Sequence, residues 1–301
     1  MEPGAASSAR RQRLAYGYAW LTVACWASVA TAFKLALREL DPPQLLLIAN
    51  AVAVLVLGAL VLVSAPRRAT LRRLPSGAHR RAVLLGVMNP LAYYLLLFHA
   101  YDTLPAQVVQ PVNYTWAIAL SLLAVPLLGQ RLGTAELLAA ALAYAGVVVI
   151  SLGLPSHGGA LHPGGLAAVL ASTVIWALYW IVNSRAGVDP LCGVLLNFGY
   201  ALPFTLGACL WFSRLPLPSA GALAAAAWVG VFEMGVTFVF WQKALLLSVN
   251  AARVSNLVFV TPVLSLAGIT LVLGEALAPT TLPGLVLILG GLLVQQRFAR
   301  T

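Results

Sequence analysis

Long apolar stretches separated by short polar gaps make up most of the sequence. Ten of them approach the roughly 20 residues that a helix needs to cross a bilayer. They lie at 14–33, 43–63, 82–101, 105–128, 133–153, 165–184, 191–212, 220–242, 249–273 and 281–296. We place a tight turn around Asp102 to Pro105, because one helix from 82 to 128 would be far longer than a span needs. The pattern predicts an all-α membrane protein with ten transmembrane helices.

The composition agrees with a membrane environment. Of 301 residues, 61% are hydrophobic and 9% are charged, whereas soluble domains carry roughly 25% charged residues. A soluble core of this length could not bury so much apolar surface, but lipid can cover it. The net charge of +10 would suit nucleic acid, yet the arginines occupy the short gaps between apolar stretches. We therefore expect the lipid bilayer, and no nucleic acid, as a partner.

The positions of the basic residues predict the orientation. With the N-terminus in the cytoplasm, only Lys34, Arg38 and Arg214 of the 18 Lys and Arg fall on the opposite side, which leaves 15 on the cytoplasmic side. Positive residues concentrate in cytoplasmic loops, and one span more or fewer would invert every later loop. We expect a multi-pass protein of a bacterial inner membrane with both termini in the cytoplasm.

The sequence gives little sign of a metal or disulfide site. Cys25, Cys192 and Cys209 all lie in apolar stretches without metal-ligand spacing. His157 and His162 lie five residues apart in a glycine-containing loop, where a metal site is conceivable but a solvated linker is the better interpretation. We expect no cofactor.

The two halves of the chain resemble one another. We divide it into a first five-helix repeat at 1–155, a connecting loop at 156–165 and a second five-helix repeat at 166–301. The matching positions come in the same order in both halves: Trp26-Ala27 with Trp176-Ala177, Asp41-Pro42 with Asp189-Pro190, Asn50 with Asn197, and Gly129-Gln130 with Gly274-Glu275. Five spans are an odd number, so the second repeat would enter the membrane inverted, as in many alternating-access transporters.

The segment TPVLSLAGITLVLGEAL at 261–277 combines a mid-span proline, a run of small residues and Leu-Gly-Glu. With the early tryptophan of each half, it resembles the EamA-type branch of the drug/metabolite transporter superfamily, and most of all bacterial exporters of aromatic and other amino acids. The first half departs from the motif, because Ala117 stands at the place of Pro262 and Gln130 replaces the glutamate. The resemblance implies a secondary transporter that exports amino acids by alternating access through a central cavity.

Prolines in four apolar stretches indicate where the helices bend. They lie in the third, fourth, seventh and ninth stretches: Pro90, Pro105, Pro111, Pro126, Pro203 and Pro262. Gly86, Gly235 and Gly268 add candidate bending points. The fifth and tenth stretches are rich in small residues, which suits close helix packing. The resemblance implies bent gating helices around the cavity, with the terminal hairpins as scaffold or homodimer contacts.

Polar and aromatic side chains at membrane depth are the candidate substrate-binding residues, because they are costly to expose to lipid. The polar candidates are Asn50, Asn89, His99, Asn113, Asn197, Glu233 and Asn256. The aromatic candidates are Trp26, Tyr93, Tyr94, Trp116, Trp176, Tyr179 and Trp180. Interhelical hydrogen bonding and core packing are the alternatives for each. Glu233, the acidic residue nearest the middle of a predicted span, could carry a proton or accept hydrogen bonds from amides.

Two other functions fit less well. The same architecture could export other amphipathic metabolites or drugs. An intramembrane enzyme would need a metal motif such as HExxH, an aspartate-rich cluster or a nucleophile–base pair, and the sequence shows none of these. We therefore do not expect an enzyme. The exact substrate, proton coupling, resting conformation and oligomeric state stay open.

Overall fold

The computed structural model describes residues 3–129, 134–152, 163–183, 187–248 and 256–298. All regular structure within these residues is helical. Seven helices are long and apolar enough to cross a membrane: Arg10–Leu37, Pro42–Leu62, Ser76–Thr103, Ala106–Leu127, Pro163–Asn183, Pro190–Phe212 and Ala220–Leu247. Three shorter apolar helices, Leu137–Ile150, Thr261–Leu273 and Thr281–Val294, fall within the remaining predicted stretches. The all-helical membrane fold is confirmed, and the number of ten crossings stays a prediction.

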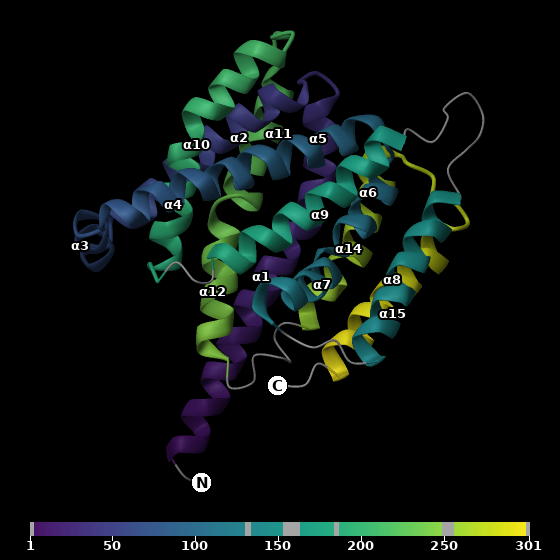
Figure 1. Ribbon diagram of the computed structural model, residues 1–301, viewed down its shortest axis with the longest axis horizontal. Coiled ribbons are helices and arrows are strands. Elements are labelled where there is room, and N and C mark those ends of the chain that lie inside the picture. Colours follow the sequence, from purple (N-terminus) through teal and green to yellow (C-terminus); the bar gives the residue numbers. More distant parts are fainter. Residues whose placement is uncertain (1–2, 130–133, 153–162, 184–186, 249–255, 299–301) are drawn as a thin grey trace.

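The helices of the first half follow the chain order shown in Figure 1. They are α1 (Pro3–Leu37), α2 (Pro42–Leu62), α3 (Ala65–Arg72), α4 (Ser76–Gly86), the π-helical turn η1 (Val87–Ala92), α5 (Tyr93–Thr103), α6 (Ala106–Asn113), α7 (Trp116–Leu128) and α8 (Thr134–Leu152). Those of the second half are α9 (Pro163–Asn183), α10 (Pro190–Phe212), α11 (Ala220–Trp228), η2 (Val229–Glu233), α12 (Val236–Leu247), η3 (Asn256–Val260), α14 (Thr261–Gly268), η4 (Ile269–Leu273) and α15 (Thr281–Phe298). Most of the predicted connecting loop, including His157 and His162, lies outside the described residues, as does Gln130.

Two helices begin with the same cap. The Asp41 carboxylate accepts a hydrogen bond from the backbone N–H of Gln44 at 3.1 Å, and Pro42 opens α2. The Asp189 carboxylate accepts one from the N–H of Cys192 at 3.0 Å, and Pro190 opens α10. Aspartate satisfies an otherwise unpaired N–H, and proline is pre-organised for the first helical turn. The matching Asp-Pro pairs in the sequence therefore have one structural role.

Four apolar stretches are interrupted in mid-span. Asn89 in η1 has extended backbone angles, φ −145° and ψ 113°. Tyr114 and Thr115 separate α6 from α7, Gly235 has φ −110° and ψ −101° between η2 and α12, and the 3₁₀ turn η3 precedes α14. The interruptions fall in the third, fourth, eighth and ninth stretches.

The seventh stretch is not interrupted, because α10 continues through Pro203, and the bend predicted there stays a prediction. A proline removes only one backbone hydrogen bond from a helix, and neighbouring helices can compensate for it. At Gly235, by contrast, an added Cβ would lie 2.7 Å from the carbonyl oxygen of Val231 and 2.9 Å from that of Gly230, so only glycine fits there. Gly235 therefore marks the break in the eighth stretch.

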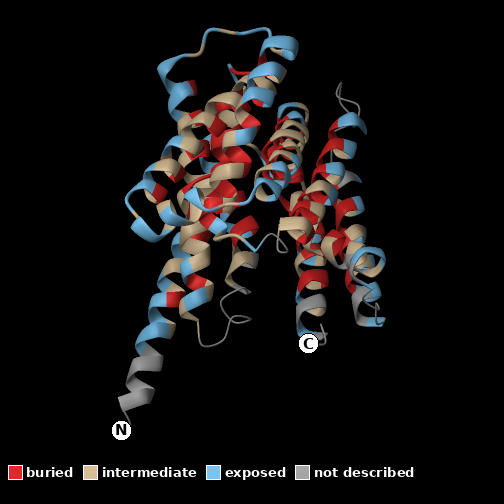
Figure 2. Cartoon of the chain, turned by 60° about the vertical axis from the view of Figure 1, so that its left-hand side comes forward, coloured by how far each residue is buried: buried red, intermediate tan, exposed pale blue. Residues whose placement is uncertain are grey.

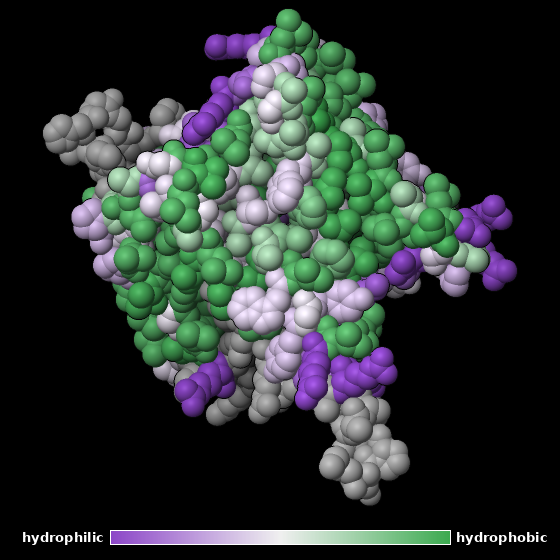
Figure 3. All heavy atoms as spheres, turned by 180° about the vertical axis from the view of Figure 1, so that it is seen from behind, coloured by the Kyte–Doolittle hydropathy of each residue, from purple (hydrophilic) through white to green (hydrophobic). Residues whose placement is uncertain are grey.

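The helices pack in pairs that join the two halves. α8 lies along α15, α2 along α10, α1 along α12 and α14, and α9 along α5 and α7. Buried residues concentrate on the faces that these helices turn toward one another (Figure 2). Seen from behind, the surface is mostly hydrophobic, with hydrophilic residues gathered toward its edges (Figure 3). Such a surface suits lipid.

Candidate functional site

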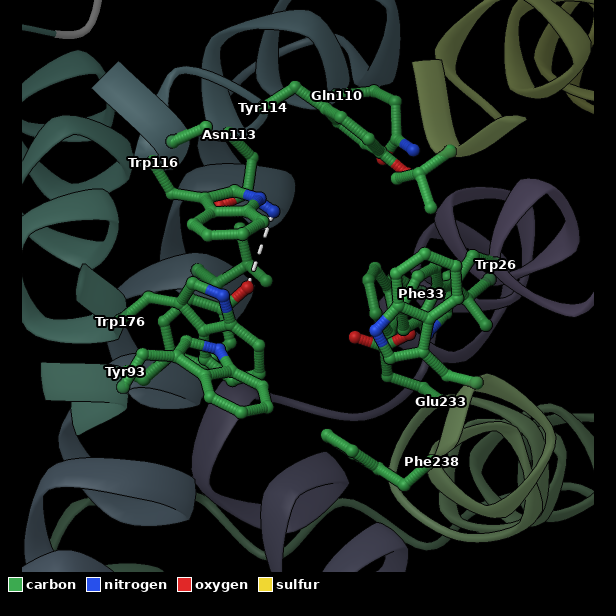
Figure 4. A pocket seen from close by; sticks show the side chains of 16 residues that line it. Trp26, Phe33, Tyr93, Gln110, Asn113, Tyr114, Trp116, Trp176, Glu233 and Phe238 are labelled. Carbon is green, nitrogen blue, oxygen red and sulfur yellow. Dashed lines mark hydrogen bonds between the residues drawn. The ribbon is translucent and has the colours of Figure 1, made fainter. Parts of the chain in front are cut away.

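A cavity of about 270 Å³ lies between the broken helices. It is close to the lower end of the roughly 300–1,000 Å³ that small-molecule sites occupy. Helices α1, α5, α6, α7, α9 and α12, together with η2 and η3, supply its walls (Figure 4). The lining residues are Trp26, Val29, Phe33, Tyr93, Leu97, Gln110, Asn113, Tyr114, Trp116, Ala117, Trp176, Trp180, Glu233, Phe238, Trp241 and Val258.

The helix breaks lie beside the cavity. Asn113 is the last residue of α6 and Trp116 the first of α7, so both flank the interruption at Tyr114 and Thr115. Glu233 ends η2 just before the irregular Gly235. Irregular backbone at membrane depth is tolerated where protein or a water-filled cavity satisfies it. Breaks in several helices around one cavity are the arrangement that discontinuous-helix transporters use for their midplane sites.

One wall of the cavity is a cluster of aromatic rings around Trp176. Its ring centroid lies 4.6 Å from that of Tyr93, 5.8 Å from those of Tyr179 and Trp180, and 6.5 Å from that of Trp116. These separations are typical of offset or edge-to-face aromatic pairs, which are worth about 0.5–1.5 kcal/mol each beyond burial. The cluster offers an apolar ligand a preformed stacking surface.

The opposite wall combines aromatic rings with a carboxylate. Trp26 and Trp241 lie 5.9 Å apart between ring centroids. Glu233 lies beside Trp26 and faces Trp176 and Tyr93 across the cavity (Figure 4). The Tyr94 hydroxyl donates a hydrogen bond to Oε1 of Glu233 at 3.1 Å. Among the described residues that line the cavity, Glu233 is the one acidic group, and none of them is a lysine or arginine.

The other polar groups of the cavity are amides, tyrosine hydroxyls and indoles. Nδ2 of Asn113 donates to the Tyr93 hydroxyl at 3.2 Å, and the Tyr101 hydroxyl donates to Oε1 of Gln110. Two buried lining atoms, Oδ1 of Asn113 and Nε1 of Trp180, have no hydrogen-bond partner within the described part of the chain. A buried donor without a partner is costly, so Nε1 of Trp180 is available to a ligand.

Seven of the sequence-predicted site residues line this cavity: Trp26, Tyr93, Asn113, Trp116, Trp176, Trp180 and Glu233. Tyr94 and Tyr179 lie directly behind the wall. Tyr94 holds Glu233, and Tyr179 stacks against Trp176 with an interplanar angle of 27°. Their role in substrate binding stays a prediction.

Asn50 and Asn197 do not belong to the described lining of this cavity, and their role in substrate binding stays a prediction. Nδ2 of Asn50 donates to the Phe198 carbonyl at 3.2 Å, in the contact between α2 and α10. Nδ2 of Asn197 donates to the Tyr179 hydroxyl at 3.1 Å. A buried amide needs hydrogen-bond partners, and these two find them between helices.

Three other sequence-predicted site residues have no described atom in the lining of the cavity. Asn89 is buried in η1 outside the lining. His99 is exposed on α5 and is also absent from the lining. Asn256 begins η3, and its side chain lies outside the described part of the structure.

Sequence reasoning missed nine lining residues: Val29, Phe33, Leu97, Gln110, Tyr114, Ala117, Phe238, Trp241 and Val258. Helical spacing could have found several of them. Val29 and Phe33 follow Trp26 at three and seven positions, which is one helix face. Gln110 and Tyr114 share a face in the same way. Trp241 lies three positions after Phe238.

Aromatic rings and a lysine surround the end of the cavity at Phe33. The ring centroid of Phe33 lies 5.0 Å from those of Phe98 and Tyr101. Nζ of the adjacent Lys34 donates to the carbonyls of Tyr101 at 2.8 Å and Leu104 at 3.2 Å. These bonds join the end of α1 to the turn between α5 and α6. This end of the cavity is therefore closed by aromatic packing and by Lys34.

Glu275 and Gln107 continue this closure. The Glu275 carboxylate accepts hydrogen bonds from the backbone N–H groups of Ala106 at 3.2 Å and Gln107 at 3.3 Å, so it caps α6. The Gln107 side chain donates to the Ala276 carbonyl at 2.8 Å and accepts from Thr281 at 2.8 Å. Glu275, which lies in the loop before α15, is thus a cap on another helix.

Metal chemistry finds no support in the described residues. Within them, no group of three His, Cys, Asp or Glu side chains could hold a metal ion, and the three cysteines are free.

Comparison with known proteins identifies the family. The model of the EamA-like transporter family matches the chain twice, at residues 13–152 and 163–295. A probable terminal-alkyne amino-acid exporter of Streptantibioticus cattleyicolor is 27% identical over 286 residues, which are 92% of this chain and 91% of that protein. An uncharacterized protein of Pseudomonas aeruginosa is 36% identical over 181 residues, 58% of this chain and 60% of that protein. The match therefore spans less than two thirds of the Pseudomonas protein.

Two further matches bear on family and fold. An uncharacterized transporter of Bacillus subtilis is 25% identical over 207 residues, 67% of each protein. A chain of known crystal structure, 22% identical, superposes with a TM-score of 0.64 over 95% of this chain and 96% of its own length, which shows the fold. The family resemblance read from the sequence is confirmed: this chain is a multi-pass membrane protein that belongs to the EamA-like transporter family.

Proposed function

We propose that this protein is a secondary transporter of the bacterial inner membrane that exports amino acids, aromatic ones above all, by alternating access through the central cavity. One observation carries the proposal: the broken helices surround a cavity that joins an aromatic wall around Trp176 to the carboxylate of Glu233. An amino acid is apolar at its side chain and charged at its ammonium group. The aromatic wall fits the first, and Glu233 fits the second.

The amino-acid part of the proposal draws support from a relative. The Streptantibioticus protein is named as a probable amino-acid exporter and aligns with nearly the whole of this chain. Export of other amphipathic metabolites or drugs is the alternative, because the same cavity would accept other apolar ligands. Since the relatives with a named role are transporters, we propose transport and not catalysis.

The ten-span inverted repeat is supported by the helix contacts. Suppose that the repeat relates α1 to α9, α5 to α12 and α7 to α14. Exchanging the two halves then converts the contact between α1 and α12 into the contact between α9 and α5. The contact of α1 with α14 likewise becomes that of α9 with α7. The two family matches and the two Asp-Pro caps agree with the same exchange. An inverted repeat would allow a second, oppositely facing packing, as alternating access requires.

The proposed topology is supported by contacts between chain segments that it assigns to the same side of the membrane. Asp41 accepts hydrogen bonds from the Ser213 hydroxyl at 2.7 Å and the Arg214 N–H at 2.9 Å, which joins two outer segments. Arg67 lies 3.6 Å from the Asp189 carboxylate, which joins two cytoplasmic segments. Each pair would be impossible if its members lay on opposite sides of a bilayer.

Flux into liposomes tests the function. Purified protein reconstituted with internal unlabelled phenylalanine should take up labelled phenylalanine faster than protein-free liposomes, and Trp26→Ala should reduce that exchange. Trp211→Ala is the matched control, because Trp211 is 84% exposed and lies outside the cavity lining. Repeating the measurement with a pH gradient shows whether transport is proton-coupled. Absence of exchange for every amino acid tested would refute amino-acid transport.

A further inference from the structure

The charges of the central cavity are not balanced by the protein itself. Glu233 is the one carboxylate among the described lining residues, and no lysine or arginine stands there to pair with it. Both lysines of the chain are engaged elsewhere. Lys34 bonds two carbonyls at the closed end, and Nζ of Lys243 lies 5.2 Å from the ring centroid of Tyr18. A cationic ligand would therefore supply the charge that the cavity lacks.

The surroundings of Glu233 suit an ammonium group attached to an apolar body. Trp26 lies beside the carboxylate, and Trp241 packs on Trp26. The faces of tryptophan rings attract ammonium groups, and the attraction grows where water is excluded. Trp176 and Tyr93 lie across the cavity (Figure 4), where a ring on the same ligand could stack.

The lining of the cavity complements the carboxylate of an amino acid less well than it complements the ammonium group. Asn113 donates one N–H to the Tyr93 hydroxyl, and Oε1 of Gln110 accepts from the Tyr101 hydroxyl, so the donors that these amides keep for a ligand are neutral N–H groups. Nε1 of Trp180 is the buried donor without a partner among the described lining groups. Neutral amide and indole donors compensate a desolvated carboxylate less well than a lysine or arginine would, and Glu233 repels it across the cavity.

We propose that this cavity binds monocationic aromatic amines, and that it binds them more tightly than the amino acid with the same side chain. Binding itself follows from the charge and shape of the cavity. The transport of these amines rests on the proposed function of the same site.

Four ligands with one phenyl ring test the charge preference. They are 2-phenylethylamine as the cation, phenylalanine as the zwitterion, 2-phenylethanol as the neutral analogue and 3-phenylpropionate as the anion. Isothermal titration calorimetry of the purified protein in detergent at pH 7 should give the amine an affinity at least tenfold above the alcohol. Phenylalanine should bind more weakly than the amine, and the anion weakest. Equal binding of amine and alcohol, or tighter binding of phenylalanine than of the amine, would overturn the proposal.

Glu233→Gln should reduce the preference for amine over alcohol to less than threefold, because it removes the charge and keeps the shape. Glu39→Gln is the matched control. This control is the same substitution in an exposed loop, where the Glu39 carboxylate accepts hydrogen bonds from Ser219. The preference for amine over alcohol should stay at tenfold. A Glu233→Gln protein that keeps the full preference would refute the role of the carboxylate.

A measurement on the unaltered protein covers the case in which Glu233→Gln does not fold. Dicyclohexylcarbodiimide, an apolar reagent for carboxyl groups, should modify Glu233, as quantified by mass spectrometry of the peptide that contains it. The amine should protect Glu233 and the alcohol should not, while modification of Glu39 stays constant. Equal protection by both ligands would count against the proposal.

Flux separates this inference from the proposed function. Amine-selective binding without exchange of any amino acid or amine would refute transport and leave the binding site standing. Amino-acid exchange that the amine does not inhibit would refute the amine site and leave the transporter standing.

Discussion

At the scale of single residues, Trp176 organises the cavity more than any other side chain. Four aromatic residues have their ring centroids within 6.5 Å of its own, and its side chain is 8% exposed. Some of its surface still lines the cavity. It therefore contributes both to the core of the protein and to the wall that a ligand would touch.

Trp176→Phe should separate these two contributions. A phenyl ring keeps an aromatic group in the core but offers a smaller stacking face, so the affinity for phenylalanine should fall several-fold, in line with about 0.5–1.5 kcal/mol per aromatic pair. Trp176→Ala should also lower the free energy of unfolding by about 3–5 kcal/mol. Competition in the exchange assay measures the first effect and thermal unfolding the second. Trp211→Phe should change neither.

Glu39 gives a pH-dependent prediction outside the membrane helices. Hydrogen bonds from the backbone N–H and hydroxyl of Ser219 lower the pKa of this carboxyl below its ordinary 4.5. Because the pKa is lower in the folded state, the carboxylate stabilises the protein above pH 4.5 and loses this effect as pH falls through the folded pKa. Glu39→Gln should lower the melting temperature at pH 7 and lower it less at pH 3. A difference that is the same at both pH values would contradict this explanation.

At the scale of elements, α8 and α15 approach closely because glycines line their contact. A Cβ added at Gly146 would lie 2.8 Å from Cγ1 of Ile288. One added at Gly290 would meet nothing within 4 Å. Small residues allow this approach where no water drives helices together. The small-residue composition of the fifth and tenth stretches thus predicted close packing but not which glycines take part.

Gly146→Ala should therefore destabilise the protein by about 1–3 kcal/mol, the cost of overpacking a tight contact. Gly290→Ala is the matched control on the partner helix and should be neutral or slightly stabilising. Thermal unfolding in detergent distinguishes the two variants. Equal effects would show that α8 and α15 do not pack as described.

The cap that Glu275 forms on α6 links the second half of the chain to the closed end of the cavity. Glu275→Ala would leave the N–H groups of Ala106 and Gln107 without these acceptors, at a cost of about 0.5–2 kcal/mol. A weaker closure should raise the rate at which a membrane-impermeant maleimide, added outside, labels Leu97→Cys in the cavity lining. The native cysteines are first replaced by serine. Glu39→Ala, which removes a carboxylate from another loop assigned to the outer side, should leave the rate unchanged.

At the scale of the whole molecule, contacts between distant segments follow the predicted sides of the membrane. Lys34 in α1, Asp102 in α5 and Glu275 in the loop before α15 border one cavity although they are far apart in sequence. All three belong to segments assigned to the outer side. The charge asymmetry of the sequence and the spatial grouping of these residues are independent observations that agree.

Single-cysteine labelling tests this topology in intact cells. Arg72→Cys in α3 and Leu217→Cys in the segment before α11 are both at exposed positions. An impermeant maleimide should label position 217 in intact cells and position 72 only after the membrane is permeabilised. Labelling of both positions in intact cells would reject the proposed orientation.

The sequence by itself determined the family, the helical membrane fold, the Asp-Pro caps and seven of the lining residues. Hydrophobicity, charge and capping are local properties, and each is written in a short stretch of chain. The sequence also suggested bends at prolines, but only the structure showed that Pro203 lies within a continuous helix.

Which helices enclose the cavity was decided by tertiary structure alone. Asn50 and Asn113 are both amides at membrane depth, yet one bonds the backbone of α10 and the other faces the cavity. Glu275 and Glu233 are both carboxylates of the second half, yet one caps α6 and the other stands in an aromatic wall. Residue type is the same in each pair. The difference lies in the neighbouring helix, which only long-range packing brings into contact.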